Sequence, residues 1–396
     1  MIENVYILPT QSGDYVYAPL SRFIEKVGSN EIEIPAPLFS VSHKGNYEYR
    51  WAHLIVIPTQ VCNLGCSYCY AKLAHSRKVI DKETLKVGYD FLLSQGQRSK
   101  SISFIGGGEP VVAWDILKWS LEYIEGRKGA QDNICYYLTT NATLLDISKV
   151  TFLHQYNVNI ELSFDILRDI QDSQRPFANS KRSSYKSVLT SISLLEHSNY
   201  NFSIRATITP QSVGLMPKMI ESLVGYKNVK KVKLEPVTGF SLDKKFYFDY
   251  TNSFWRAREV GRRIEIEVTN SIVSSVKNIR EQFCTGEFCI TPDGIISACH
   301  RNSSDIDEMF SASYVGNVCN HVDISYEKMT KFLQFASIPT RCNSCFARWH
   351  CAGFCPMEWK GISNEETLQK CNFIRENVRR TIFEIYNIDA AESEKP

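Results

Sequence analysis

Three cysteines near the start of the chain, Cys62, Cys66 and Cys69, restrict what the surrounding segment can become. Their C-x3-C-x2-C spacing lets each thiolate bind one iron of a four-iron, four-sulfur cluster and leaves the fourth iron without a protein ligand. A structural zinc site, the alternative, normally uses four Cys or His ligands in two short pairs. The nearest further candidate is His75, but a lone His after a cysteine triplet is more often a surface residue. The triplet therefore favours a cluster with one open iron.

Length, charge and cysteine usage narrow the class of protein. The chain has 396 residues, enough for a large core and more than one domain. Its formal net charge of +2 gives no reason to expect a nucleic-acid partner. No apolar stretch approaches the length of a membrane span, and the first residues do not begin a signal peptide. Thirteen cysteines without a secretion signal indicate metal ligation in a reducing compartment, so we expect a cytoplasmic protein without a membrane partner.

Apolar runs alternate with helical patterns from residue 53 onward. Residues 53–58 are typical of a buried strand that ends just before Cys62, and Asp81 is the expected N-cap of a helix through Leu93. Six strand–helix units predict an α/β fold in which a parallel sheet curls toward a barrel. The further expected elements are strand 101–105, helix 112–125, strand 135–139, helix 143–155, strand 158–163, helix 185–197, strand 202–209, helix 214–225 and strand 231–235.

Parallel α/β folds bind ligands at the carboxyl ends of their strands. The second strand is followed by three glycines, Gly106 to Gly108, and then by Glu109. Glycine allows the backbone to approach a ligand closely, and the carboxylate of Glu109 can take the ammonium group of an amino acid. Such a glycine run is by itself a weak signal of ligand binding, since most glycine runs are simply turns.

Polar residues also follow the later strands. Ser163 and Asp165 alternate onto one face at the end of the fourth strand and can hydrogen-bond ribose hydroxyls, or else cap a turn. Arg205 lies inside the apolar fifth strand and needs an anionic partner, either a ligand carboxylate or Glu235. We expect Asn141 to form a turn.

The cysteine triplet, with Tyr68 just before the last cysteine, resembles the signature of the radical S-adenosylmethionine (SAM) superfamily. In that family SAM chelates the open iron through its amino and carboxylate groups. The segment with Asp172 and Arg175 also resembles this superfamily, and we expect it to be structural, bridging a helix start. The resemblance implies SAM contacts from Tyr68, Gly107, Gly108, Glu109, Ser163, Asp165 and Arg205.

Eight further cysteines form an array between positions 284 and 371. A turn sequence at 291–294 separates two short expected strands within its first part. The array resembles the SPASM domain, a C-terminal extension of radical SAM enzymes that holds two auxiliary iron–sulfur clusters; two zinc sites are the alternative. The resemblance implies one cluster on Cys284, Cys289, Cys299 and Cys355, and another on Cys342, Cys345, Cys351 and Cys371.

Two cysteines remain outside these sets. Cys135 sits in an apolar strand, and we expect a small buried hydrophobic residue. Cys319 lies in a polar loop, and we expect it to be inert, although donation of a hydrogen atom to a substrate radical is the alternative. No carboxylate or His outside the motifs stands out as a general base.

These patterns together predict a partial (β/α)6 TIM-like barrel followed by a C-terminal cysteine-rich SPASM domain. The first residues carry two strand-like runs, 5–8 and 14–17, whose edge can pair with an extended peptide. They loosely resemble the start of maturases that act on bacterial ribosomal peptides. The expected domains are an N-terminal β-containing cap at 1–50, the barrel at 51–240, a helical linker at 241–280 and the SPASM domain at 281–396.

The resemblance implies an oxidoreductase with three [4Fe–4S] clusters, in which SAM is cleaved to methionine and a 5′-deoxyadenosyl radical that abstracts hydrogen from a substrate carbon. The expected partners are a precursor peptide and a low-potential electron donor such as flavodoxin or ferredoxin. Two fully ligated auxiliary clusters suit an oxidative carbon–carbon crosslink, as in cyclophane-forming maturases, because no open iron remains for a substrate thiolate. The alternatives are a thioether-forming maturase, a peptide epimerase with Cys319 or Cys135 as hydrogen donor, a sulfatase-type formylglycine maturase, and a non-catalytic iron–sulfur or zinc scaffold.

Overall fold

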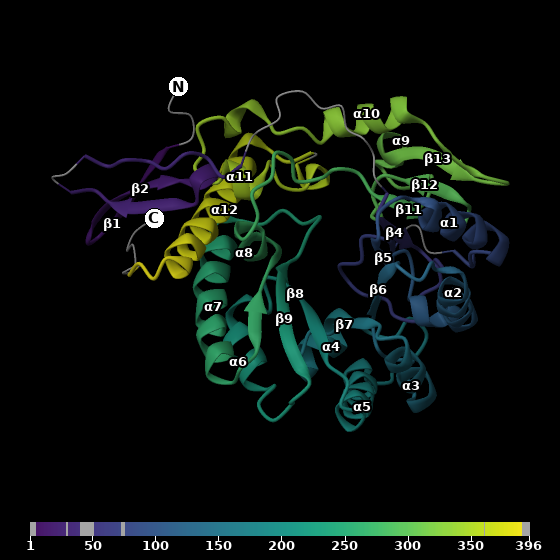
Figure 1. The fold of residues 1–396 in the computed structure, drawn as a ribbon. Coiled ribbons are helices and arrows are strands. Elements are labelled where there is room, and N and C mark those ends of the chain that lie inside the picture. Colours follow the sequence, from purple (N-terminus) through teal and green to yellow (C-terminus); the bar gives the residue numbers. More distant parts are fainter. Residues whose placement is uncertain (1–4, 29–30, 40–50, 73–75, 360, 390–396) are drawn as a thin grey trace.

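The computed structural model describes residues 5–28, 31–39, 51–72, 76–359 and 361–389, so His75 lies outside the described residues. Within those residues the strands form an 11-stranded sheet and a separate three-stranded sheet (Figure 1). The order of the large sheet is β10-β9-β8-β7-β6-β5-β4-β11-β12-β13-β14. No helix in these ranges is long and apolar enough to cross a membrane.

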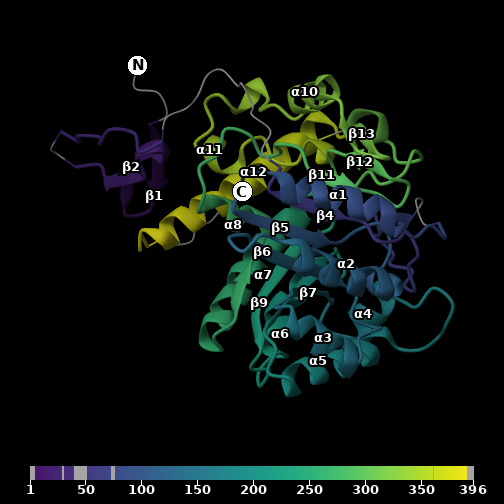
Figure 2. The same ribbon diagram turned by 45° about the vertical axis from the view of Figure 1, so that its right-hand side comes forward.

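Six neighbouring strands of the large sheet run parallel in chain order, which confirms the predicted strand–helix units. Figures 1 and 2 show them curving as an incomplete barrel with helices on the outside. The strands are β4 (His53–Val56), β5 (Ser99–Phe104), β6 (Asn133–Thr140), β7 (Asn159–Ser163), β8 (Phe202–Ile208) and β9 (Val229–Pro236).

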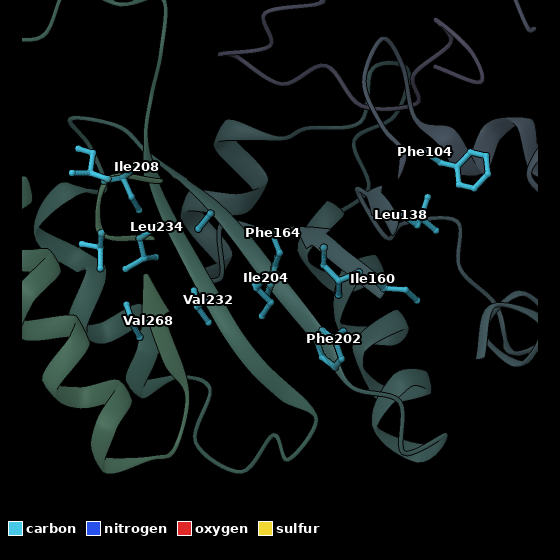
Figure 3. Close-up of a cluster of buried hydrophobic side chains, with 14 of the residues drawn as sticks. Phe104, Leu138, Ile160, Phe164, Phe202, Ile204, Ile208, Val232, Leu234 and Val268 are labelled. Atoms are coloured by element: carbon cyan, nitrogen blue, oxygen red, sulfur yellow. The ribbon is translucent and has the colours of Figure 1, made fainter. Parts of the chain in front are cut away.

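Alternation along β5 to β8 separates a buried, mostly apolar outer face from a more exposed inner face. In β8, for example, Phe202, Ile204 and Ile208 are buried whereas Arg205 is only half-buried. Figure 3 shows the apolar side chains of β5 to β10 gathered in one cluster. The helices that connect the strands are α1 (Lys82–Ser94), α2 (Trp114–Arg127), α3 (Ile147–Gln155), α4 (Arg168–Gln174), α5 (Ser184–His197) and α6 (Met216–Glu221).

Helix starts follow local capping chemistry. Asp81 accepts a hydrogen bond from the Thr84 amide at 2.8 Å, which confirms it as the N-cap of α1. Short 3₁₀ segments occur at Pro19–Ser21, Pro110–Ala113, Val213–Leu215, Thr340–Cys342 and Pro356–Glu358.

The segment predicted as a helical linker also extends the sheet. It contains α7 (Lys244–Arg263), the short strand β10 (Glu267–Thr269), which pairs in parallel with β9, and α8 (Ser271–Val276). A Cβ atom at Gly261 would lie 2.6 Å from the Ile266 carbonyl oxygen, so glycine allows the chain to turn back directly after α7. A strand of three residues is too short to show a periodic pattern, and this is why the sequence did not reveal it.

The C-terminal region is joined to the barrel by strand pairing. Strand β11 (Phe288–Ile290) pairs in parallel with β4, and β11 to β14 then pair antiparallel, with Gly294 at a φ of +70° in the predicted turn between the first two. The other elements are β12 (Ile295–Ser297), α9 (Phe310–Ser313), β13 (Tyr314–Val318), β14 (Val322–Ile324), α10 (Tyr326–Phe335), α11 (Arg348–Cys351) and α12 (Asn364–Ile385).

The N-terminal sheet contains the two predicted strands as β1 (Tyr6–Thr10) and β2 (Gly13–Ala18), followed by β3 (Phe23–Lys26), all antiparallel. It is held against the C-terminal region, because the Tyr17 hydroxyl lies 2.6 Å from His350 Nε2 in a buried contact.

Phe288 provides a test of the junction between barrel and C-terminal region. It is 1% exposed and packs against Trp51 and Phe91, with ring centroids 5.6 and 5.3 Å apart. Phe288→Ala is expected to lower the free energy of unfolding by about 3–5 kcal/mol because it leaves a cavity. Phe248→Ala, at a residue 59% exposed on α7, serves as control and should change it by less than about 0.5 kcal/mol. Chemical denaturation followed by circular dichroism measures both, and equal losses would contradict the packing described.

Candidate active site

A cavity of about 280 Å³ lies at the carboxyl ends of the parallel strands. This is the position at which parallel α/β folds bind ligands, and the size approaches that of small-molecule sites. Its lining comes from both halves of the chain. It includes the triplet Cys62, Cys66 and Cys69, the strand-end residues Gly107, Gly108, Glu109, Ser163, Arg205 and Glu235, and also His300, Arg301 and Glu358 from the C-terminal region.

The loop that carries the three cysteines is fixed by backbone hydrogen bonds to the last residue of α4 and to the segment after it. The Gly65 amide donates to the Pro176 carbonyl at 2.8 Å, and the Ser67 amide donates to the Gln174 carbonyl at 2.9 Å. These bonds give the loop a defined path, so all three thiols line the cavity.

Burial disfavours the charged form of these thiols. It raises the pKa of Cys62 to about 12 and that of Cys66 to about 11, and it also raises the pKa of Cys69. A metal-bound cysteine is a thiolate, so binding must release protons and supply positive charge. Three buried thiols at one wall therefore suit a metal cluster that provides this charge.

Asp165 does not line the cavity but lies behind its wall, where it is fully buried. Its carboxylate accepts hydrogen bonds from the Tyr68 hydroxyl at 2.5 Å and from Gln174 Nε2 at 2.8 Å. It also pairs with Arg175 Nε at 3.0 Å and accepts from the Thr207 amide at 2.9 Å. The structure thus gives Asp165 four protein donors, whereas the predicted ribose contact would need it at the cavity surface.

Sequence reasoning treated Arg175 only as part of a helix start, but the structure places it in the wall of the cavity. Its guanidinium lies 5.2 Å from the centroid of the Tyr68 ring and hydrogen-bonds the Cys66 sulfur, which opposes the rise in the pKa of Cys66. Asp172 does have the predicted structural role, because it accepts a hydrogen bond from the Tyr185 amide at 2.9 Å at the start of α5. The ion-pair partner of Arg175 is Asp165, ten residues earlier in the chain, and not Asp172.

The glycine-rich segment packs directly against the cysteine loop. The Gly108 amide donates to the Thr59 carbonyl and the Glu109 amide to the Val61 carbonyl, both at 2.8 Å. A Cβ atom at Gly108 would lie 2.0 Å from the Val61 carbonyl oxygen, and Gly107 has a φ of +63°. Glycine is required here because two backbones touch.

Glu109 is 3% exposed and lies in a donor-rich position at the cavity wall. Its carboxylate accepts hydrogen bonds from Thr140 Oγ1 at 2.5 Å, from the Asn141 amide at 2.6 Å and from the Val111 amide at 3.0 Å. Burial raises the pKa of Glu109, while these donors lower it. Asn141 thus forms the expected turn and also fixes Glu109.

Arg205 and Ser163 line the same cavity as the thiols. Within the part of the chain that the structure describes, the Arg205 guanidinium has no hydrogen-bond or ion-pair partner. Its alternative partner, Glu235, accepts a hydrogen bond from Ser271 Oγ at 2.8 Å instead. A half-buried cation without a protein anion is therefore available to a negatively charged ligand.

The two predicted cysteine sets of the C-terminal region are each brought together. Burial is the largest cause of the raised pKa of Cys284, Cys289 and Cys299, and neighbouring cysteines raise it further. Cys355 acts on Cys284, both of these act on Cys299, and Cys299 acts on Cys289. Among the described residues, no group of three or more His, Cys, Asp and Glu side chains is placed so that it could hold a single metal ion. The second set lines one small cavity of about 20 Å³, and its members are Cys342, Cys345, Cys351 and Cys371.

Neither remaining cysteine lines the cavity. The prediction that Cys135 is buried is wrong, since both Cys135 and Cys319 are exposed. Cys135 lies on the inner face of β6, where Tyr137 is also exposed. On the outer face of the same strand, Tyr136 and Leu138 are buried. An apolar composition did not distinguish these two faces.

Fold and site together define an α/β protein with a cysteine-lined cavity at the carboxyl ends of its parallel strands. Residues 56–222 match the model of the Radical SAM superfamily, so the chain contains a radical SAM domain. The cysteine-rich region that follows this domain has the position predicted for a SPASM extension.

Three curated relatives illustrate the likeness. An uncharacterised protein of Methanocaldococcus jannaschii is 30% identical over 46% of this chain and 62% of its own length. A cysteine-type anaerobic sulfatase-maturating enzyme of Clostridium novyi is 22% identical over 60% of this chain and 70% of its own length. The radical SAM cyclopropyl synthase TigE of Paramaledivibacter caminithermalis is 22% identical over 76% of this chain and 66% of its own length. The chain thus spans about two thirds of the relatives it matches.

A solved structure, native anSMEcpe with bound AdoMet and the Kp18Cys peptide, superimposes with a TM-score of 0.71 at 20% sequence identity. The match covers 85% of this chain and 99% of the other. At this identity the likeness shows the fold, which confirms the predicted radical SAM barrel with its C-terminal extension.

Gly108 offers a test of how the site is built. Gly108→Ala is expected to lower the iron content of the anaerobically reconstituted protein severalfold, because the new methyl group collides with the Val61 backbone. Gly126→Ala is the control, since a Cβ there meets no atom within 4 Å and alanine favours the surrounding helix α2. Iron and sulfide analysis measures both, and normal loading of Gly108→Ala would contradict the close approach.

Proposed function

We propose that this chain is a cytoplasmic radical SAM maturase that oxidises a side chain of a ribosomally made precursor peptide and forms a carbon–carbon crosslink. The observation that carries the proposal is one cavity whose lining joins three thiols at the barrel to Arg301 and Glu358 of the second cysteine region. An oxidative reaction needs both a site that activates the substrate and a nearby group that accepts an electron.

The residues of the cavity fit a cluster with bound SAM. Cys62, Cys66 and Cys69 would hold the cluster, and the free guanidinium of Arg205 would bind the SAM carboxylate. The SAM amino group would lie at the backbone of Gly107 and Gly108, near Glu109, as the family resemblance implies. Tyr68 and Ser163 complete the proposed contacts. Bound together, the two groups supply reductive cleavage of SAM and abstraction of a hydrogen atom from a substrate carbon.

A second cavity, of about 420 Å³, provides room for a peptide segment. Its wall combines apolar side chains such as Phe240, Phe354 and Met357 with carboxylates such as Glu366. It adjoins the first cavity, since both are lined by Glu235, Pro236, Val237, Thr238, Arg301 and Glu358. A side chain entering from the second cavity would therefore face the first.

Two auxiliary clusters are proposed on the cysteine sets of the C-terminal region, one on Cys284, Cys289, Cys299 and Cys355 and one on Cys342, Cys345, Cys351 and Cys371. Four thiolates at each would leave no iron free for a substrate thiolate, which favours a carbon–carbon bond over a thioether. A hydrogen donor, as an epimerase needs, would have to reach the cavity, and Cys135 and Cys319 do not line it. A low-potential donor such as flavodoxin or ferredoxin is the proposed electron source.

Arg205 tests the proposed SAM site. Arg205→Gln is expected to weaken SAM binding about 30-fold, or roughly 2 kcal/mol, because the carboxylate loses a half-buried charged partner. Lys233→Gln is the control, since Lys233 pairs with Glu161 at 2.5 Å and does not line the cavity. Equilibrium dialysis of labelled SAM with the reconstituted proteins measures both. Wild-type affinity in Arg205→Gln would rule out this carboxylate contact.

The reaction itself is tested on a candidate precursor peptide, and a short open reading frame beside the gene is the first place to search for one. After anaerobic reaction with SAM and a reductant in heavy water, the product is expected to lack two hydrogens and to contain no solvent deuterium at carbon. Mass spectrometry reads both quantities. Gain of one deuterium without net oxidation would instead identify an epimerase and contradict the crosslink.

A pair of cysteine variants controls this experiment. Cys66→Ala should abolish formation of 5′-deoxyadenosine, whereas Cys135→Ser, at an exposed strand position, should retain it. Equal cleavage of SAM by both variants and the wild type would contradict the assignment of the triplet. No cleavage by the wild-type protein would favour a non-catalytic scaffold.

A further inference from the structure

Arg301 joins three separate parts of the molecule at the boundary between the two cavities. Its guanidinium lies 5.5 Å from the centroid of the Tyr70 ring, just after the cysteine triplet. It donates to Thr238 Oγ1 at 3.0 Å, beyond the end of β9, and lies 4.0 Å from Cys355 Sγ. It also pairs with Glu358 Oε1 at 3.5 Å. A single cation thus contacts the triplet loop, the barrel and the second cysteine region.

The charge of Arg301 is only partly neutralised. Glu358 is shared, because its other oxygen binds Lys370 Nζ at 2.6 Å. Two cations therefore face one carboxylate beside Cys355, at side chains that are 14–22% exposed. Charges at such sites are screened less by water and salt than charges at the surface.

A second carboxylate, that of Glu287, lies near the same cysteine set. Glu287 accepts hydrogen bonds from the His300 amide and from His300 Nδ1, at 2.6 and 2.9 Å. Its carboxylate opposes the effect of Arg301 on the potential of that set. Because it is present in every variant considered below, it contributes equally to each and leaves the differences between them unchanged.

We infer that Arg301 raises the reduction potential of an iron–sulfur cluster held by Cys284, Cys289, Cys299 and Cys355, and that it does so from within the wall of the reaction cavity. This inference rests on the proposed function, which places a cluster there. Reduction of such a cluster adds one electron and no proton, so a fixed cation stabilises the reduced state. Hydrogen bonds to the sulfur atoms and nearby charge are among the main determinants of such potentials.

Arg301 is therefore a positioning residue, which acts on the reaction through the cluster that accepts the electron. Arg175 gives a useful comparison, since it contacts Tyr68 and the Cys66 sulfur in the same manner but is paired with the buried Asp165. Each cysteine site that borders the cavity thus has its own arginine and its own carboxylate. In the case of Arg301, a shared carboxylate leaves more of the positive charge uncompensated.

The test is a redox titration of the full-length protein followed by electron paramagnetic resonance. Cys62→Ala, Cys66→Ala and Cys69→Ala are combined in one background, so that only the auxiliary clusters contribute to the spectrum. In this background, Arg301→Gln is expected to lower the potential of one of the two couples and to leave the other unchanged. The expected shift changes the ratio of reduced to oxidised cluster at least tenfold at fixed potential, or about 59 mV for one electron.

Glu358→Gln provides a second variant with the opposite expected sign. It removes the carboxylate that neutralises Arg301, so the same couple should move to higher potential. A purely structural role of these side chains would not produce shifts of opposite direction. Arg258→Gln is the matched control, because Arg258 is similarly buried, pairs with Glu384 and contacts no cysteine; both potentials should stay unchanged.

Two results would overturn the inference. One is an unchanged reduction potential in Arg301→Gln at full iron content. The other is a reduction potential in Glu358→Gln that does not rise. If Arg301→Gln does not take up its clusters, the result for Glu358→Gln decides. Failure of the proposed function can be distinguished from failure of this inference. Opposite shifts together with no SAM cleavage by the wild-type protein would retain the role of Arg301 and reject the maturase. A background without any cluster signal would reject both.

Discussion

The carboxylate of Asp165 holds the active-site half of this molecule together. It is fully buried, and its donors come from the cysteine loop, from α4 and the residue after it, and from β8. A buried charge is stable only when it is paired and hydrogen-bonded, and removing one partner typically costs about 3–5 kcal/mol. One carboxylate that does not line the cavity therefore fixes the path of the cysteine loop, the position of Arg175 and the contact between α4 and the end of β8.

Much of the fold and the metal chemistry can be predicted from the sequence, because both depend on spacing. The parallel strands of the barrel follow from alternating apolar runs, and the cysteine sets follow from the intervals between cysteines. The role of Asp165 does not, because strand periodicity places it on the same face as Ser163. In the structure β7 ends at Ser163 and Ile166 adopts a φ of +65°, so the alternation stops and Asp165 turns behind the wall.

The same limit explains the other differences. Cys135 lies in an apolar run, but only one face of β6 is packed against helices, and composition does not tell which. Arg301 and Glu358 were not singled out because their importance arises from contacts between segments more than fifty residues apart. Properties fixed along the chain can thus be read from it, whereas properties fixed by tertiary contacts require the structure.

The inner face of the barrel differs from that of a closed (β/α)8 barrel, whose interior is packed with branched apolar side chains. Here the inner positions include ion pairs, such as Lys233 with Glu161 at 2.5 Å and Lys231 with Glu267 at 2.9 Å. Charged side chains at these positions remain partly exposed, and the apolar core lies outside the sheet (Figure 3). The open side of the barrel is instead met by the C-terminal region, which supplies the remaining wall of the cavity.

The contact between Tyr17 and His350 joins residues separated by 333 positions in the chain. A second contact, from the Tyr386 hydroxyl to the Arg22 carbonyl at 2.7 Å, joins the N-terminal sheet to α12. During synthesis at ~5–20 residues per second, Tyr17 leaves the ribosome roughly 20 to 60 s before His350 has been made. The first strands to be translated thus cannot complete their contacts until the last residues of the C-terminal region have been made.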